Sequence, residues 1–137
     1  MSENAAWPPM TRDAKSAEFF DAARRGELAI KKCTGCGLSL APEAMVCTDC
    51  GGSDPVWASA SGAGALVTWT TVHKAPNRAF TDLVPYTVGI VELAEGPWLY
   101  AGILGEPGAG AALRVEFVHP PEGESYPVWV VENGDPA

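Results

Sequence analysis

The chain has 137 residues, of which 47% are hydrophobic and 19% charged, with a net charge of −8. This length and composition suit a folded unit with a buried core and exclude a disordered tail, while 15 glycines and 12 prolines argue against a helical bundle and for short strands joined by turns. Only nine Lys and Arg residues stand against 17 acids, which disfavours a general nucleic-acid binder, because such a protein needs a surplus of cations for phosphates.

Residues 1–27 form the first predicted region, an extension followed by a helix. The start of the chain is proline-rich and is expected to be extended. A helix is predicted over 11–26, because Phe19 and Phe20 belong to one apolar stripe and Gly26 is a good C-terminal stop. This stripe either docks on the rest of the domain or reaches out to a partner protein, and the sequence leaves both open.

Residues 28–57 are predicted to be a zinc ribbon. The segment has no long apolar stretch, but it carries two Cys-x-x-Cys knuckles, Cys33 with Cys36 and Cys47 with Cys50. A two-residue spacer lets both sulfurs of a knuckle reach one ion, and four thiolates satisfy tetrahedral Zn²⁺. Because every ligand position is a cysteine, the site is closed and the metal is expected to be structural. Iron in a rubredoxin-like site is the alternative, since the same thiolates would hold it.

The compartment follows from the lack of targeting signals in this sequence. The N-terminus shows no basic region followed by an apolar run, and no stretch approaches the ~20 apolar residues of a membrane span. We therefore expect a cytoplasmic protein without a membrane partner. Thiols stay reduced in the cytoplasm, which favours metal ligation by the cysteines over disulfides.

Residues 58–137 are predicted to form a five-stranded barrel. They contain five strand-like runs separated by turn signals, at 64–73, 86–93, 98–104, 113–118 and 126–131. Five short strands in this length fit the OB-type Greek-key barrel, and Gly89 within the second run is consistent with a bend or bulge that closes it. The predicted fold class is mainly β: an N-terminal helix, a rubredoxin-like zinc ribbon, then an OB-fold barrel.

Two functions remain open from the residues alone. Zinc ribbons and OB-folds both occur in nucleic-acid proteins, and barrel aromatics can stack bases, so a single-stranded nucleic-acid-binding or regulatory module is one alternative. Against it, the barrel is acidic and has no Lys or Arg beside its aromatic residues. The other alternative is an iron-containing electron carrier.

The order of the motifs resembles a known family. The matching stretches are 16–28, the two cysteine knuckles, 61–76, 84–93 and 126–129, which together span nearly the whole chain. In this order they resemble the zinc-ribbon plus OB-fold family of acyl-CoA-associated proteins. Each motif alone is much less specific than their succession.

The resemblance implies a small partner subunit of a thiolase-superfamily enzyme, an aldolase (a lyase) or thiolase that acts on acyl-CoA. The closest-looking role is beside the lipid-transfer-protein-like aldolase of steroid side-chain degradation, where the module often ends a hydratase subunit. It implies a non-catalytic chain that docks on its partner, in a two-plus-two complex, and helps form the acyl-CoA channel. The sequence itself agrees, because it shows no Ser/His/Asp or Cys/His arrangement.

CoA recognition needs cations for phosphates and an apolar groove. The candidates near the end of the first barrel strand are His73, Lys74, Arg78 and Phe80. Lys31 and Lys32, just before the first knuckle, are the next candidates.

A partner interface needs exposed apolar anchors. Phe19 and Phe20 on the predicted helix are candidates, together with Trp7 and Trp129, which are both expected to be exposed. The second histidine, His119, precedes two prolines and is expected to be a solvent-exposed turn residue.

Overall fold

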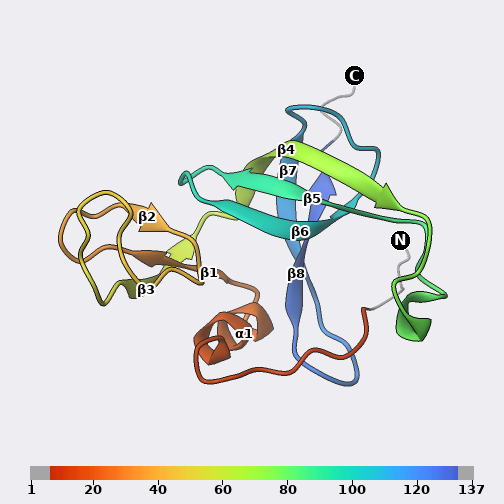
Figure 1. Cartoon of the computed structure of the whole chain (residues 1–137), viewed down its shortest axis with the longest axis horizontal. Coiled ribbons are helices and arrows are strands. Elements are labelled where there is room, and N and C mark those ends of the chain that lie inside the picture. Colours follow the sequence, from red (N-terminus) through yellow and green to blue (C-terminus); the bar gives the residue numbers. More distant parts are fainter. Residues whose placement is uncertain (1–6, 133–137) are drawn as a thin grey trace.

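The computed structural model describes residues 7–132 as one helix, a small sheet and a barrel. The elements in chain order are α1 (Ala17–Arg24), β1 (Leu28–Lys32), β2 (Ser39–Leu40), β3 (Val56–Ala60), β4 (Ala63–Val72), the 3₁₀ turn η2 (Arg78–Phe80), β5 (Tyr86–Leu93), β6 (Trp98–Leu104), β7 (Ala112–Val118) and β8 (Tyr126–Val131). Figure 1 shows the small sheet to one side of the barrel, with α1 beside β1 and β8. The predicted fold class is confirmed.

The first sheet has the strand order β2-β1-β3 and carries the cysteine knuckles in its loops. β1 pairs antiparallel with β3 along its whole length, from Leu28 opposite Ala60 to Lys32 opposite Val56. β3 therefore crosses the boundary expected between residues 57 and 58. β3 belongs to the small sheet and leads directly into β4 of the barrel, so it connects the ribbon to the barrel.

The barrel is closed, with the strand order β4-β5-β6-β8-β7 and a return pairing of β7 with β4. Its five strands are those predicted, within one residue at each end. All pairings are antiparallel except the short parallel contact of β6 with β8, which joins Ile103 to Trp129 and Leu104 to Val130. Beyond that contact, towards their N-terminal ends, β6 and β8 are not paired.

Gly89 lies at a close approach of β5 to β4. A Cβ at this position would stand 2.6 Å from the backbone oxygen of Thr68, so only glycine fits. The register shift of the pair falls on β4, between Leu66 and Thr68. The predicted irregularity is thus real, but the extra residue belongs to the neighbouring strand and Gly89 gives it room.

The hydrophobic core is continuous from the small sheet into the barrel. Its buried members are Leu28 and Ile30 of β1 together with Leu66, Val91, Leu93, Ile103, Leu113 and Trp129 of the barrel. The expectation that Trp129 is exposed is wrong: its side chain is 0% exposed. Trp129 is opposite Val115 of β7 and Ile103 of β6, and its side chain packs with both in the core between the barrel and β1.

The helix is shorter than predicted, because residues 11–16 belong to a non-helical segment, the strap (residues 7–16), which ends in a turn at 14–16. Arg12 donates two hydrogen bonds of 2.9 Å to the carboxylate of Glu124, and the backbone N–H of Glu124 donates to the Met10 carbonyl at 3.0 Å. These contacts tie the strap to the loop between β7 and β8, so residues 10–12 cannot join the helix. Figure 1 shows the strap running under the barrel to α1.

The structure contains no helix, among residues 7–132, whose length and hydropathy would let it cross a membrane.

Candidate functional site

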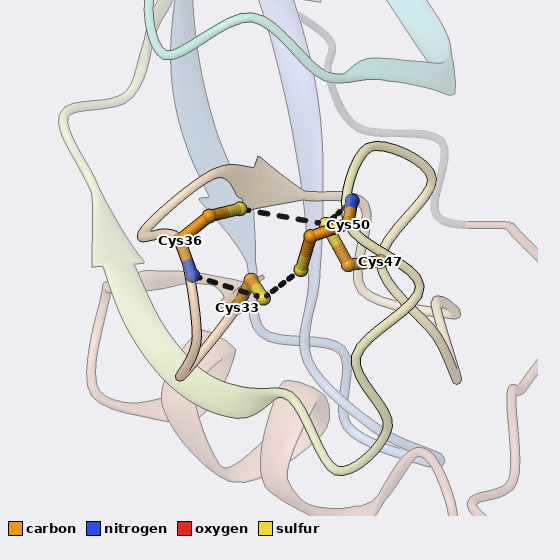
Figure 2. Close-up of side chains that lie close together, drawn as sticks. All are labelled: Cys33, Cys36, Cys47 and Cys50. Atoms are coloured by element: carbon orange, nitrogen blue, oxygen red, sulfur yellow. Dashed lines mark hydrogen bonds between the residues drawn. The ribbon is translucent and has the colours of Figure 1, made fainter.

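The four cysteines converge on one point from two separate loops (Figure 2). All four Sγ atoms lie within 4.8 Å of one another. The Sγ atoms of Cys33 and Cys50 are 3.5 Å apart, and those of Cys36 and Cys47 are 3.7 Å apart. With Zn–S bonds of about 2.3 Å, sulfurs at the corners of a tetrahedron are about 3.8 Å apart. The donor set and its spacing therefore fit one Zn²⁺.

The knuckle backbones prepare the sulfurs for a cation. The N–H groups of Gly35 and Cys36 point at the Cys33 sulfur at 3.3 and 3.5 Å. Donation from Cys36 and then Gly35 lowers the pKa of the Cys33 thiol to about 6. The N–H groups of Cys50 and Asp49 lower the pKa of Cys47 in the same way. Both thiols thereby favour the thiolate form, which is the form that binds metal.

The cluster is closed and half-buried, as a structural metal site requires. Cys33 and Cys47 are buried beside Leu40, and Cys36 and Cys50 face outward. With four thiolates the tetrahedron is complete, which leaves no position for water or substrate. The geometry supports folding of the ribbon rather than catalysis on the metal.

The predicted CoA-contacting residues lie together on the loop between β4 and β5. His73, Lys74 and Arg78 are exposed, and Phe80 is half-buried. The Phe80 ring packs on Trp7 of the strap, with ring centroids 5.8 Å apart. Within the described part of the chain, neither Lys74 nor Arg78 has a carboxylate partner.

Lys31 and Lys32 are neighbours on β1 but face different surroundings. The Lys31 Nζ atom donates to the Ala44 carbonyl at 2.9 Å and lies 4.9 Å from the centre of the Trp57 ring. Lys32 is exposed and has no such contact among the hydrogen bonds of residues 7–132. The alternation of the strand therefore separates two residues that the sequence treats alike.

The predicted interface residues differ in their burial and in the elements that they contact. Phe19 and Phe20 of α1 are half-buried, and Phe19 packs against the barrel core. Trp7 is half-buried between the β4–β5 loop and β6. Its ring centroid is 4.8 Å from that of Tyr86, and a Cβ at Gly102 would meet it at 3.1 Å. The expectation that Trp7 is exposed is therefore wrong, because its ring packs on Phe80 and Tyr86. Trp7, Phe19 and Phe20 are all half-buried, whereas Trp129 is fully buried.

One pairing was missed by sequence reasoning. The Nδ1 atom of His119, exposed as predicted, lies 2.8 Å from the Oγ atom of Ser125. Ser125 is buried, so its hydroxyl is not open to a substrate carbonyl, and the contact closes the loop between β7 and β8. The only signal in the sequence is the Pro-Pro-Glu-Gly turn at 120–123 that brings the two residues together.

Two family models match consecutive parts of the chain. Residues 20–56 match "ChsH2, rubredoxin-like zinc ribbon domain". Residues 57–118 match "ChsH2, C-terminal OB-fold domain". Together they cover the four cysteines and most of the barrel.

Curated relatives and a solved structure agree with these models. A probable enoyl-CoA hydratase alpha subunit of Thermomonospora curvata is 34% identical over 98 residues, which is 72% of this chain and 30% of that protein. A DUF35 domain-containing scaffold protein of Pyrococcus furiosus is 36% identical over 65 residues, 47% of each chain. The chain thus spans about a third to a half of the length of these relatives. A chain of the solved "Ltp2-ChsH2(DUF35) aldolase" superposes with a TM-score of 0.73 at 29% identity, over 90% of this chain and 98% of that one.

Proposed function

Because the chain belongs to the ChsH2 family, in which a rubredoxin-like zinc ribbon precedes an OB-fold domain, we propose that it is a non-catalytic accessory subunit of a thiolase-like enzyme acting on acyl-CoA. The proposed partner is an Ltp2-like aldolase, with a hydratase as a further member of the complex. The observation that carries this proposal is the structural match to the Ltp2-ChsH2 aldolase over nearly the full length of both chains.

In this role the partner supplies the carbon–carbon bond chemistry. All four cysteines of the chain lie in the metal cluster. The serine that contacts a histidine, Ser125, is buried. Among residues 7–132, the hydrogen bonds pair no exposed serine or cysteine with a histidine, which supports leaving the nucleophile or base to the partner.

The β4–β5 loop is the proposed contribution of this chain to the acyl-CoA channel. Lys74 and Arg78 are exposed cations on an acidic barrel, where Arg114, the remaining cation, is held by Glu116 and Glu132. Phosphate oxygens of CoA are suitable acceptors for Lys74 and Arg78, which pair with no carboxylate of residues 7–132. His73 and Phe80 would line the same passage.

The metal in this proposal is Zn²⁺ with a structural role. A colourless preparation with one zinc per chain is expected, whereas a red, iron-containing one with a reversible one-electron couple would favour an electron carrier. The site needs reduced thiols, which suits the proposed cytoplasmic location.

Co-expression with an Ltp2-like aldolase tests the proposal. Retro-aldol cleavage of a β-hydroxyacyl-CoA is followed by chromatography of the CoA esters, with each chain alone and with the purified complex. Activity is expected only when both chains are present, and the mass of the complex should match two copies of each. Turnover by this chain alone, or a fully active aldolase that does not co-elute with it, would overturn the proposal. Salt-dependent binding of a single-stranded oligonucleotide in place of the aldolase would restore the nucleic-acid alternative.

The channel role has its own test in the same complex. The double variant Lys74→Met with Arg78→Met is expected to raise KM for the acyl-CoA about tenfold and leave kcat unchanged, because it removes phosphate contacts that do not change during the reaction. Arg114→Met is the matched control, since this barrel cation is already paired. An unchanged KM in the double variant would remove the loop from the channel.

A further inference from the structure

A groove of about 560 Å³ opens where α1, the ribbon and the barrel meet. It lies over the N-terminal parts of β6 and β8, which are paired with β5 and β7 but not with each other, since β6 and β8 pair only at Ile103 and Leu104. Its walls are mostly apolar and come from all three units, including Phe19, Phe20, Met45, Trp57, Tyr100 and Pro127. None of His73, Lys74, Arg78 and Phe80 lines it, so it is separate from the proposed CoA contacts.

The groove leaves large apolar side chains open to solvent. Tyr100 is 87% exposed and Met45 is 59% exposed, and the two line the same groove from the barrel and from the ribbon. Covering such surface contributes about 25 cal/mol for each Å² removed from water. The volume lies within the range of about 300–1,000 Å³ that is typical of small-molecule sites.

Lys31 places a positive charge in the mostly apolar lining of the groove. Lys31 is the only half-buried charged residue of the lining, since Asp13, Lys15 and Glu43 are exposed. Its Nζ atom is fixed by the Ala44 carbonyl and the Trp57 ring, and no carboxylate of residues 7–132 pairs with it. One of its three N–H donors is used, which leaves two for an acceptor.

Asp13, one of the two acids that line the groove, is engaged at the start of α1. The Asp13 carboxylate accepts from the backbone N–H groups of Ser16 and Lys15 at 2.8 and 3.0 Å and from the Ser16 hydroxyl at 2.9 Å. The hydrogen bonds from the Ser16 hydroxyl and backbone N–H lower the pKa of Asp13, and the backbone N–H and charge of Lys15 add to this effect. The negative charge is thus held at the start of the helix. Among residues 7–132, neither Asp13 nor Glu43, the other acid of the lining, forms an ion pair with Lys31, so its ammonium group has donors for a ligand.

We propose that this groove binds an amphipathic anion of small-molecule size. The apolar body, a ring system or a chain, covers Tyr100 and Met45, and the acidic head group accepts hydrogen bonds from Lys31. The inference goes beyond the proposed function, because such binding is a property of this chain without its partner.

The test uses the full zinc-loaded chain and 8-anilinonaphthalene-1-sulfonate, an aromatic anion whose fluorescence rises in apolar sites. Saturable binding at one site is expected. Lys31→Met keeps the aliphatic stem and is expected to weaken binding about tenfold, as the loss of a charge-assisted hydrogen bond would. Lys32→Met is the matched control on the same strand outside the groove, and it is expected to change the affinity less than about twofold.

A second pair of variants tests the apolar wall. Tyr100→Ala should weaken binding, whereas Trp98→Ala, two residues earlier on β6 and outside the groove, should not. Zinc content and far-UV circular dichroism equal to those of the wild type show that each variant is folded. The proposal would be overturned if Trp98→Ala weakened binding of the probe, or if neither Lys31→Met nor Tyr100→Ala changed its affinity.

Competition separates charge from hydrophobicity. Dodecanoate and dodecyltrimethylammonium share one chain length and carry opposite charges. In the wild type, dodecanoate should displace the probe at a much lower concentration than dodecyltrimethylammonium does. In Lys31→Met, this difference between the two amphiphiles should disappear. Equal displacement by the two amphiphiles would contradict the role of Lys31. The proposal of a small-molecule ligand would be overturned if the chain showed no saturable binding and the groove were shielded from solvent only in the complex with an aldolase. That result would assign the groove to a protein partner.

Discussion

Trp98 and Trp129 show how the surroundings of a residue decide its contribution. Both lie on barrel strands, yet Trp98 is 54% exposed and Trp129 is 0% exposed. The Trp129 ring lies in the core shared by β1 and the barrel, and its indole N–H has no acceptor among the described residues. Its value to the fold is therefore packing and not hydrogen bonding.

Substitution of the two tryptophans should have very different effects on stability. Trp129→Ala is expected to lower the free energy of unfolding by about 3–5 kcal/mol, because it leaves a cavity in the core. Trp98→Ala is expected to stay within about 0.5 kcal/mol of the wild type. Urea unfolding followed by circular dichroism measures both. Trp129→Phe should cost less than Trp129→Ala, since phenylalanine leaves a smaller cavity and the indole N–H has no hydrogen bond to lose. Equal costs for Trp129→Ala and Trp98→Ala would contradict the core assignment.

At the scale of elements, the strap over residues 7–16 is held at both ends. At one end Trp7 packs on Phe80 and Tyr86, and its backbone N–H donates to the Tyr126 hydroxyl at 2.8 Å. At the other end Arg12 bridges Glu124 and Asp21, at 2.9 and 2.8 Å. The strap thus joins the β4–β5 loop, the β7–β8 loop and α1.

The arginine clamp predicts a dependence of stability on pH. The hydrogen bonds from Arg12 lower the pKa of Glu124 and Asp21 below their ordinary values of 4.5 and 3.8. Carboxylates with a lowered folded-state pKa contribute their stability above the unfolded-state value and lose it as the pH falls through the folded-state value. The stability difference between the wild type and Arg12→Met should therefore be constant from pH 7 to about 5 and shrink below about 4.5.

Urea midpoints of the two proteins at each pH measure this difference. Effects common to both, such as competition of protons for the metal, cancel in the comparison. Arg25→Met is the control, because Arg25 forms an exposed ion pair with Glu27 that contributes little. A difference that stays constant down to pH 3 would contradict the clamp.

At the scale of the whole molecule, the metal site and the barrel are coupled through β1. Leu28 and Ile30 of this strand are buried in the same core as the barrel residue Trp129, and Cys33 follows directly after its end. Loss of the metal should therefore reach the barrel as well as the ribbon.

Removal of the metal by a chelator is expected to lower the Tm of the entire chain by about 10 °C or more, in one transition. Scanning calorimetry and the combined fluorescence of the five tryptophans should report the same midpoint. Zn²⁺ added back should restore it, and Mg²⁺ should not, because thiolates do not suit that ion. An unchanged barrel transition after chelation would show that the two units fold independently.

The local pattern of the sequence is enough to predict the five barrel strands and the metal site, whereas the strands β1, β2 and β3 of the small sheet were not predicted. The β5, β6 and β8 bounds follow from turn signals and from runs of β-branched and apolar residues, which act over neighbouring positions. The cysteine site follows from two spacings of two residues, because a knuckle closes locally whatever surrounds it. The order of these motifs also shows the family.

Closure of the barrel decides the features that local patterns do not contain. The burial of Trp129 depends on pairing with both β6 and β7, and the strap depends on Arg12 meeting Glu124, 112 residues later. The groove is formed by residues of α1, the ribbon and the strands β6 and β8, which the fold brings together. Each is set by contacts between residues far apart in sequence, and propensity and periodicity report only on near neighbours.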